Sequence, residues 1–430
     1  MGNNITNLRV FHQPNYPKDP EFLALRVNRF YREKVQNSLN GKHILRGGVP
    51  GQDAICLMSN DYLSLADHPD ILRTQAEALI KDGNGMLMSA VFLNGETPQH
   101  LFEQRLASFM RAERGLLCQS GWCANTGLIQ TIADERTPVY LDMLAHMSLW
   151  EGARSAGATV VAFIHNDPEH LERQILKHGP GVIAVDSVYS TDGSVCPLKE
   201  IVAIGVAQGC VLVVDESHSL GTHGEHGEGL TVSMGLEDQV HFRTASLAKA
   251  FSGRAGFITC SERFHEYFIC ESRPSVFSSS MLPHEIAALN QTLSIIQGDD
   301  WRRETLHANA SYLREHLDRA GYNLRGSQSQ IISLESGSVP QTIALRDSLE
   351  KRGLFGAPFW TPATPMNRSI IRFSVNSTLT KTDLNRIVQI CDEIRDEVDM
   401  ANWASTRRKR SVSRCEETSA RTFDREFVFA

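Results

Sequence analysis

Short apolar runs rich in β-branched residues recur along the middle of the chain, separated by stretches of helical character. Five of these runs lie at 139–141, 159–163, 182–185, 211–214 and 257–259. Between them, 167–178 and 198–209 carry apolar residues at helical spacing. Apolar strands that alternate with helices are typical of a parallel sheet covered on both faces. The sequence therefore predicts an α/β fold with a mostly parallel sheet flanked by helices.

The flanking regions carry a different pattern. Residues 20–40 have helical spacing and end at Asn40-Gly41, a pair that commonly stops a helix. Further along, helix and strand candidates follow one another at 301–320, 330–333, 370–374 and 381–397. This mixture indicates a smaller α+β domain, to which the N-terminal segment is a candidate addition.

We expect four parts in the chain. They are an N-terminal helix and arm over 1–60, a large α/β domain over 61–290, a smaller α+β domain over 291–400 and a tail over 401–430. The tail lacks periodicity and contains seven Arg or Lys residues against four acidic ones. These features favour a disordered segment whose basic run is a candidate contact for acidic surfaces.

The composition excludes several classes of protein. With 430 residues, 41% hydrophobic and 22% charged, the chain can bury a large core. Its net charge of −7 argues against nucleic acid as a partner. No apolar run approaches the roughly 20 residues that span a bilayer, and the nine cysteines show no disulfide-like pattern. We therefore expect a cytoplasmic protein without stable membrane insertion.

Ligands of parallel sheets bind beyond the carboxyl ends of the strands, and four groups of polar residues follow predicted strands here. The first group is the run 119–125 (QSGWCAN), which includes Ser120, Gly121 and Trp122 and follows the apolar run 115–118. Backbone N–H groups at such a turn can bind a phosphate. An ordinary strand–helix turn explains the same residues.

The second group, Asp215 and His218, follows the run 211–214. A buried acid needs a partner, so we expect Asp215 to face a cation or a protonated nitrogen. With His223 and His226 these residues also allow a metal site, since imidazole and carboxylate are zinc ligands. The glycines around the two later histidines favour a solvated loop instead, and no metal is expected.

The third and fourth groups centre on Lys249 and His146. Lys249 lies among Ala, Leu and Phe with no acid nearby in the sequence. Partial desolvation would lower the pKa of its amine and make it a nucleophile toward carbonyl groups, whereas a surface lysine is the alternative. His146 lies at a predicted strand–helix junction, where a purely structural role is the alternative.

Together, the four groups provide an amine nucleophile, a buried acid, an aromatic ring and a phosphate site. Pyridoxal 5′-phosphate (PLP) requires this combination.

The order of these motifs resembles the α-oxoamine synthases, the fold-type I PLP enzymes that condense an amino acid with an acyl-CoA. The resemblance extends from Ser59-Asn60-Asp61-Tyr62-Leu63 to Ile371-Arg372-Phe373-Ser374. Three further runs, 120–122, 145–154 and 215–224, resemble a subgroup of the family that makes a quorum-sensing signal in bacteria.

The resemblance assigns roles to matching residues. Lys249 matches the lysine that binds PLP as a Schiff base and moves the α-proton, and Asp215 matches the acid that pairs with the pyridine nitrogen. His218 matches the residue that hydrogen-bonds the phenolic oxygen, and His146 the imidazole stacked on the ring. The other cofactor-binding matches are Ser120, Gly121, Trp122, Ser190, Ser246 and Ser279.

Substrate and partner expectations follow from the same resemblance. Asn60 and Arg372 match groups that hold the amino-acid carboxylate, for which a guanidinium offers two parallel hydrogen bonds. The segment around Ser279 resembles one that reaches the phosphate of a neighbouring subunit, which implies a homodimer with shared active sites. The implied reaction releases CoA and CO₂ and gives an α-aminoketone.

One stretch departs from the family pattern. Residues 83–92 (GNGMLMSAVF) lack an arginine found in members that act on glycine or alanine, and apolar residues replace small ones. We expect this stretch to accommodate a fatty acyl chain and a different amino acid. The resemblance to the quorum-sensing subgroup implies a medium-chain acyl-CoA of the decanoyl-CoA type, with 2-aminobutyrate or S-adenosylmethionine as the amino acid. The alternatives are an 8-amino-7-oxononanoate synthase, a 2-amino-3-ketobutyrate CoA ligase and, more distantly, a metal-dependent hydrolase.

Overall fold

The computed structural model describes residues 17–37 and 45–407 of the chain. The chain forms two compact units, Met1–Gly47 and Gly48–Ala430. The described part of the first unit is α1 (Glu21–Phe30), which continues as the π-helix η1 (Tyr31–Asn37). The helix expected within 20–40 is therefore present, and its predicted end at Asn40-Gly41 lies outside the described residues.

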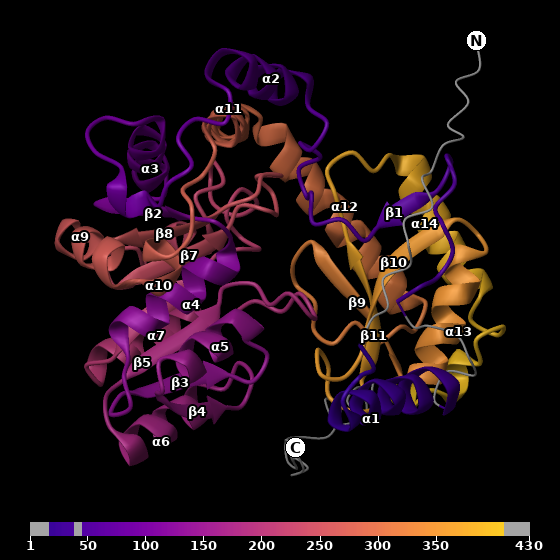
Figure 1. The fold of residues 1–430 in the computed structure, drawn as a ribbon. Coiled ribbons are helices and arrows are strands. Elements are labelled where there is room, and N and C mark those ends of the chain that lie inside the picture. Colours follow the sequence, from indigo (N-terminus) through magenta and orange to yellow (C-terminus); the bar gives the residue numbers. More distant parts are fainter. Residues whose placement is uncertain (1–16, 38–44, 408–430) are drawn as a thin grey trace. The chain divides into compact units, whose positions relative to one another are not determined.

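The second unit contains a seven-stranded sheet with the strand order β2-β8-β7-β6-β5-β3-β4 (Figure 1). Its strands are β2 (Arg114–Cys118), β3 (Pro138–Asp142), β4 (Thr159–Phe163), β5 (Val182–Asp186), β6 (Val211–Asp215), β7 (Phe242–Ser246) and β8 (Gly256–Cys260). Neighbouring strands are parallel except in the two pairs that contain β8. The mostly parallel sheet predicted from the sequence is thus confirmed.

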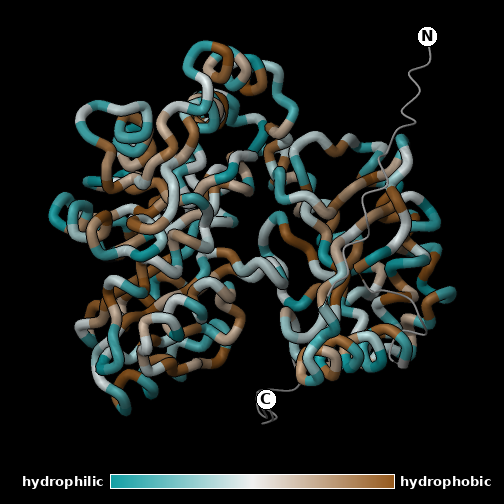
Figure 2. Tube along the Cα trace, viewed as in Figure 1, coloured by the Kyte–Doolittle hydropathy of each residue, from teal (hydrophilic) through white to brown (hydrophobic). Residues whose placement is uncertain are grey.

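Helices connect and cover the strands of this unit. They are α2 (Pro69–Asp82), α3 (Pro98–Phe109), α4 (Gly121–Ile132), α5 (Met147–Ser155), α6 (Pro168–His178), α7 (Leu198–Ala207), α8 (Leu230–Ser233), α9 (Glu262–Glu271), α10 (Arg273–Val276), α11 (Pro283–Gly298), α12 (Asp300–Arg319), α13 (Val339–Glu350) and α14 (Lys381–Glu393), with the 3₁₀ turns η2 (Ala90–Phe92) and η3 (Met400–Asn402). Hydrophobic and hydrophilic residues are interspersed along α2 (Figure 2), whose buried residue is Ile71.

Successive residues of a strand point to opposite faces of its sheet. On β5, Ile183 belongs to a buried cluster that includes side chains of α6 and α7. The next residue, Ala184, belongs to a different cluster, with side chains of α4 and α5. Because helices cover both faces, the central strands are apolar without interruption, and this accounts for the runs in the sequence.

A second, four-stranded sheet has the order β1-β10-β11-β9. Its strands are β1 (Ile55–Leu57), β9 (Ile331–Gly337), β10 (Leu354–Phe359) and β11 (Ser369–Ser374). Strand β1 pairs in parallel with β10, so a segment expected in the N-terminal arm contributes an edge strand here. A domain boundary at residue 290 would fall inside α11, a continuous helix.

The expected tail begins later than predicted. Residues 401–407 continue the fold, with η3 and a further helical turn over 404–407. Trp403 is 1% exposed, and its Nε1 donates a hydrogen bond of 2.9 Å to the carbonyl oxygen of Val398. The assignment of 401–407 to a disordered tail is therefore wrong, because a buried indole anchors the segment. The basic run that begins at Arg408 lies outside the described residues.

Within the described ranges, the helices are all too short or too polar to cross a membrane.

Substituting Trp403 tests whether this segment belongs to the folded core. Trp403→Ala removes a fully buried ring and should lower the free energy of unfolding by about 3–5 kcal/mol, measured by urea denaturation. Trp301→Ala is the matched control, because the Trp301 side chain is 49% exposed. Equal stability changes in the two variants would contradict a core role for Trp403.

Candidate active site

The carboxylate of Asp215 lies at the carboxyl end of β6 and is 4% exposed. Its Oδ1 accepts a hydrogen bond of 2.8 Å from the backbone N–H of Ser217, and its Oδ2 accepts one of 2.7 Å from Nδ2 of Asn125. Both donors are neutral, and no ion pair holds this carboxylate in the described part of the chain. A buried negative charge in this setting favours a protonated nitrogen as an additional partner.

Asn125 lies in the predicted run 119–125, but the sequence assigns it no role. It lies one turn into α4, and besides Asp215 its Nδ2 donates to Oγ of Ser148 over 2.8 Å. Its Oδ1 accepts from Oγ1 of Thr244 over 2.6 Å. The amide thus fixes the carboxylate relative to α5 and β7. The only signal in the sequence is an amide near a helix start, which is a common feature.

Lys249 lies in the turn between β7 and β8, beside the buried residues Leu247 and Ala250. Burial lowers the pKa of its amine, the charge of Arg372 adds to this effect, and the charge of Asp215 opposes it. The predicted environment, a partly desolvated amine among apolar residues, is therefore present. A lowered pKa increases the unprotonated fraction of the amine, and the unprotonated form is the nucleophilic one.

His146 caps the N-terminus of α5 and lies close to the same charged groups. Loss of hydration lowers the pKa of its imidazole, the charge of Asp215 opposes this shift, and the charge of Lys249 adds to it. Its backbone N–H donates to Oδ2 of Asp186 over 2.9 Å, and its Nδ1 lies 2.7 Å from Oγ of Ser148. The Trp122 ring lies edge-on, 6.2 Å from the imidazole between centroids.

The start of α4 packs closely against the end of β7 and the start of β8, so no side chain fits at Gly121 or Gly256. Ser120 caps α4, and its Oγ accepts a hydrogen bond of 3.1 Å from the backbone N–H of Cys123. A Cβ atom on Gly121 would lie 2.6 Å from Cβ of Ser246, and one on Gly256 would lie 2.2 Å from the carbonyl oxygen of Ser120. A twelve-residue helix thus begins beside the Ser246 hydroxyl, an arrangement suited to an anion.

The second sheet contributes Arg372 to the site. This residue of β11 is 6% exposed, and its guanidinium lies over the ring of Phe359. Its Nη2 donates to Oδ1 of Asn60 over 3.0 Å, and its Nη1 donates to the carbonyl oxygen of Ser190 over 2.9 Å. Its buried Nε has no hydrogen-bond partner among the described residues. The predicted carboxylate-binding pair is therefore in direct contact.

The histidines of the alternative metal site contact different partners. His218 lies next to Tyr62, His223 next to His307, and His226 is 3.6 Å from Asp300. The described residues contain no group of three metal-ligating side chains that includes these histidines. The metal-dependent hydrolase therefore lacks a ligand set in this part of the protein.

Ser279 is exposed and lies beside the phosphate-side segment of its own chain. Its carbonyl oxygen accepts a hydrogen bond of 2.6 Å from Nε2 of Gln119, the residue before Ser120. It also forms an isolated bridge with Ser89, in the stretch that departs from the family pattern. Its role toward a neighbouring subunit stays a prediction.

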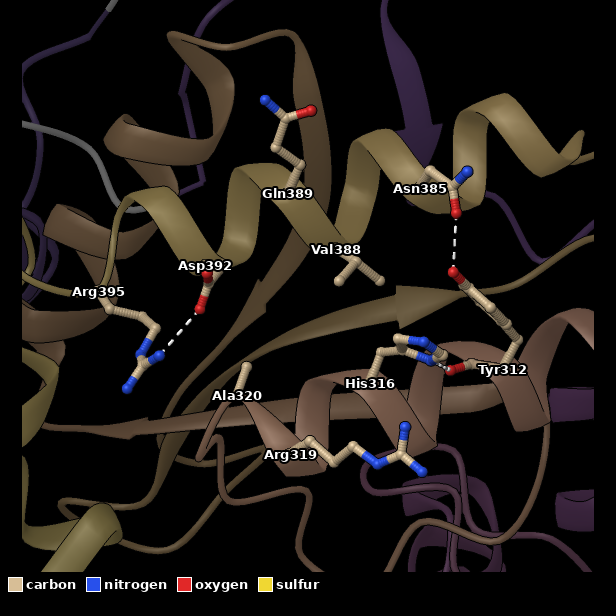
Figure 3. A pocket seen from close by; sticks show the side chains of 9 residues that line it. All are labelled: Tyr312, His316, Arg319, Ala320, Asn385, Val388, Gln389, Asp392 and Arg395. Atoms are coloured by element: carbon tan, nitrogen blue, oxygen red, sulfur yellow. Dashed lines mark hydrogen bonds and ion pairs between the residues drawn. The ribbon is translucent and has the colours of Figure 1, made fainter.

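A separate groove of about 390 Å³ lies between α12 and α14 (Figure 3). Its lining includes Tyr312, His316, Arg319, Asn385 and Arg395. Tyr312 donates a hydrogen bond to Asn385, and Arg395 donates one to Asp392. None of the predicted site residues lines this groove.

Comparisons with known proteins agree with this geometry. The model of the aminotransferase class I and II family matches residues 52–390. The CAI-1 autoinducer synthase of Vibrio campbellii is 44% identical over 374 residues, which cover 87% of this chain and 95% of that protein. The 8-amino-7-oxononanoate synthase of Geotalea daltonii is 30% identical over 376 residues, 86% of this chain and 95% of that protein.

Among solved structures, a serine palmitoyltransferase of Sphingomonas wittichii superposes with a TM-score of 0.79 and 25% identity. The superposition covers 88% of this chain and 97% of that one. The chain belongs to the aminotransferase class I and II family, and within it to the α-oxoamine synthases, which are PLP-dependent acyltransferases. The fold, the enzyme class and the cofactor expected from the sequence are confirmed.

The residues of this chain fit PLP on their own chemistry. The Asp215 carboxylate is buried without an ion pair and suits a pyridinium nitrogen, and the Lys249 amine has a lowered pKa. The start of α4 and the Ser246 hydroxyl offer donors to a phosphate. These three features match the three polar ends of the cofactor.

The charge of Arg372 on Lys249 gives a testable effect. Arg372→Gln removes a cation that disfavours the charged amine, so the pKa of Lys249 should rise and its labelling by an acylating reagent at fixed pH should slow. Peptide mass spectrometry of the cofactor-free protein measures the rate, with the other lysines as internal references. Arg368→Gln is the control, because Arg368 precedes the same strand and pairs with Glu335. Unchanged or faster labelling in Arg372→Gln would refute the coupling.

Proposed function

We propose that the protein condenses an amino acid of the 2-aminobutyrate or S-adenosylmethionine type with a medium-chain acyl-CoA of the decanoyl-CoA type. The products are CoA, CO₂ and an α-aminoketone precursor of the CAI-1 quorum-sensing autoinducer. The observation that carries this proposal is the 44% identity to a CAI-1 autoinducer synthase along almost its whole length.

Four side chains would act on the cofactor and its substrate. Bound PLP withdraws electrons from the α-carbon of the amino acid joined to it. Lys249 would hold PLP through its amine and later take the α-proton with that amine, which its lowered pKa permits. Asp215 would keep the pyridine nitrogen protonated, His146 would cover the ring, and His218 would donate to the phenolic oxygen.

The cofactor phosphate would lie at the start of α4. The residues that would surround it are Ser120, Gly121, Trp122, Ser190, Ser246 and, from a second subunit, Ser279. The helix N-terminus offers backbone N–H groups and a partial positive charge to the phosphate.

Asn60 and Arg372 would hold the substrate carboxylate. Arg372 already binds two oxygen atoms of the protein, so its guanidinium is fixed in direction. A buried and oriented guanidinium keeps the carboxylate in one position until CO₂ departs.

The acyl chain would contact the stretch that departs from the family pattern. Met86, Leu87 and Phe92 are 75%, 71% and 65% exposed. Large exposed apolar side chains close to a reaction site suit a long acyl chain or another apolar surface. The protein would act as a cytoplasmic homodimer with shared active sites.

A substrate screen tests the proposed chemistry. The PLP-loaded protein is incubated with decanoyl-CoA and 2-aminobutyrate or S-adenosylmethionine, and thiol release and the α-aminoketone are measured by absorbance and mass spectrometry. Glycine and alanine with acetyl-CoA or succinyl-CoA form the comparison set. We expect kcat/KM at least about tenfold higher for the medium chain, since each buried CH₂ contributes about 0.8 kcal/mol. A preference for the short substrates would instead support an α-oxoamine synthase of cofactor biosynthesis, as in the 30% identical relative.

Replacing the lysine tests its proposed role. Lys249→Ala should lower turnover by about 10³-fold or more, because it removes both the covalent attachment and the base. The protein should still fold, and borohydride should no longer attach the cofactor covalently to it. Lys199→Ala is the control, because Lys199 lies in α7 away from the site residues. Substantial synthesis by Lys249→Ala would remove the residue from the mechanism.

A further inference from the structure

Tyr62 is a buried residue with no place in the scheme above. It lies in the loop after β1 with 0% of its surface exposed, and its hydroxyl oxygen is 2.7 Å from Nδ1 of His218. The two rings are 6.0 Å apart between centroids and tilted by 57°. The contact is therefore a hydrogen bond through the hydroxyl and not a stacking interaction.

The backbone around this hydrogen bond is held on both sides. The carbonyl oxygen of His218 accepts from Oγ1 of Thr222 over 3.0 Å and from Nε2 of Gln330 over 2.7 Å. The carbonyl oxygen of Tyr62 accepts from the backbone N–H of Ser377 over 2.9 Å. With both main chains fixed, the hydroxyl has a constant position relative to the imidazole.

Both side chains are neutral in this environment. Burial raises the pKa of Tyr62 above its usual range, so the hydroxyl keeps its proton. Burial lowers the pKa of His218 well below its usual range, and the positive charges of Lys249 and Arg372 and the nearby His146 lower it further. The imidazole therefore carries one proton, which can occupy either Nδ1 or Nε2.

The distances indicate where that proton lies. Two other polar groups lie beside the Tyr62 hydroxyl in the described part of the chain. The Ser374 hydroxyl donates to it, which partly offsets the effect of burial on the pKa of Tyr62, and Oδ1 of Asn60, a possible acceptor, lies at 3.3 Å. This distance exceeds the usual range for O–H···O bonds, and the same Oδ1 already accepts from Arg372. The hydroxyl proton is thus directed to Nδ1 of His218, which must then be unprotonated.

We propose that Tyr62 is a positioning residue that fixes His218 in the tautomer with its proton on Nε2. The consequence of this tautomer for catalysis rests on the proposed function. With Nδ1 bound to Tyr62, the Nε2–H group is the donor that His218 would offer to the phenolic oxygen of PLP. In the other tautomer, Nε2 would present a lone pair to that oxygen and repel it.

Nitrogen NMR of the cofactor-free protein, labelled with ¹⁵N-histidine, tests the tautomer directly. The His218 signals are assigned by their loss in His218→Asn. In the unchanged protein we expect a single form with its proton on Nε2, and in Tyr62→Phe a signal averaged between the two tautomers. Tyr322→Phe is the matched control, because Tyr322 is also buried and donates over 2.7 Å to the Cys391 carbonyl oxygen, which is remote from His218.

A proton on Nδ1 of the unchanged protein would overturn the proposal, and this outcome does not depend on whether Tyr62→Phe folds. An identical tautomer in Tyr62→Phe would overturn it as well.

Kinetics of the PLP-loaded protein add a second readout. Tyr62→Phe should lower kcat by about tenfold, as the loss of a hydrogen bond that orients an active-site histidine typically does, and leave the KM for the amino acid within about twofold. A tautomer change without any α-aminoketone synthesis by the unchanged protein would remove the proposed function and leave the role of Tyr62 intact. A normal kcat with a changed tautomer would overturn the catalytic consequence.

Discussion

The hydrogen bond between Asn125 and Asp215 is the contact on which the site depends. It holds a buried carboxylate in place with a neutral donor, so the negative charge stays available to a ligand. The same amide binds Ser148 and Thr244, and it thereby ties together the start of α4, the start of α5 and the end of β7. Ser120 directly precedes α4, His146 directly precedes α5, and Lys249 lies in the turn after β7. One amide with three partners therefore fixes the positions of α4, α5 and β7 around Asp215.

The sequence reveals most strands of the large sheet, because burial on both faces favours uninterrupted apolar residues. It does not reveal β7, in which Arg243, Thr244 and Ser246 interrupt the apolar pattern. Arg243 is nevertheless 2% exposed, since its guanidinium binds the carbonyl oxygen of Met110. Strands β1 and β10 are missed because the three residues of β1 become a strand only through pairing with a segment far along the chain.

The same distinction applies to the site. Lys249 and Asp215 are recognisable because their residue types carry a chemistry that few other side chains supply. Asn125 and Tyr62 are not, since their roles exist only through partners 90 and 156 positions away. The histidines near His218 illustrate the opposite case: their close spacing allows shared ligation of a metal, but the described residues contain no group of three ligating side chains. Function can be predicted from sequence where it lies in one side chain, and much less where it lies in a contact.

The contact between Asn60 and Arg372 joins residues 312 positions apart, which has a consequence for protein synthesis. A nascent chain that ends before β11 already contains Lys249 and Asp215 but lacks the guanidinium. In the folded protein that cation helps to lower the pKa of Lys249. Residues that precede β11 therefore cannot complete the site on their own, and the site forms only once the last strand of the second sheet is in place.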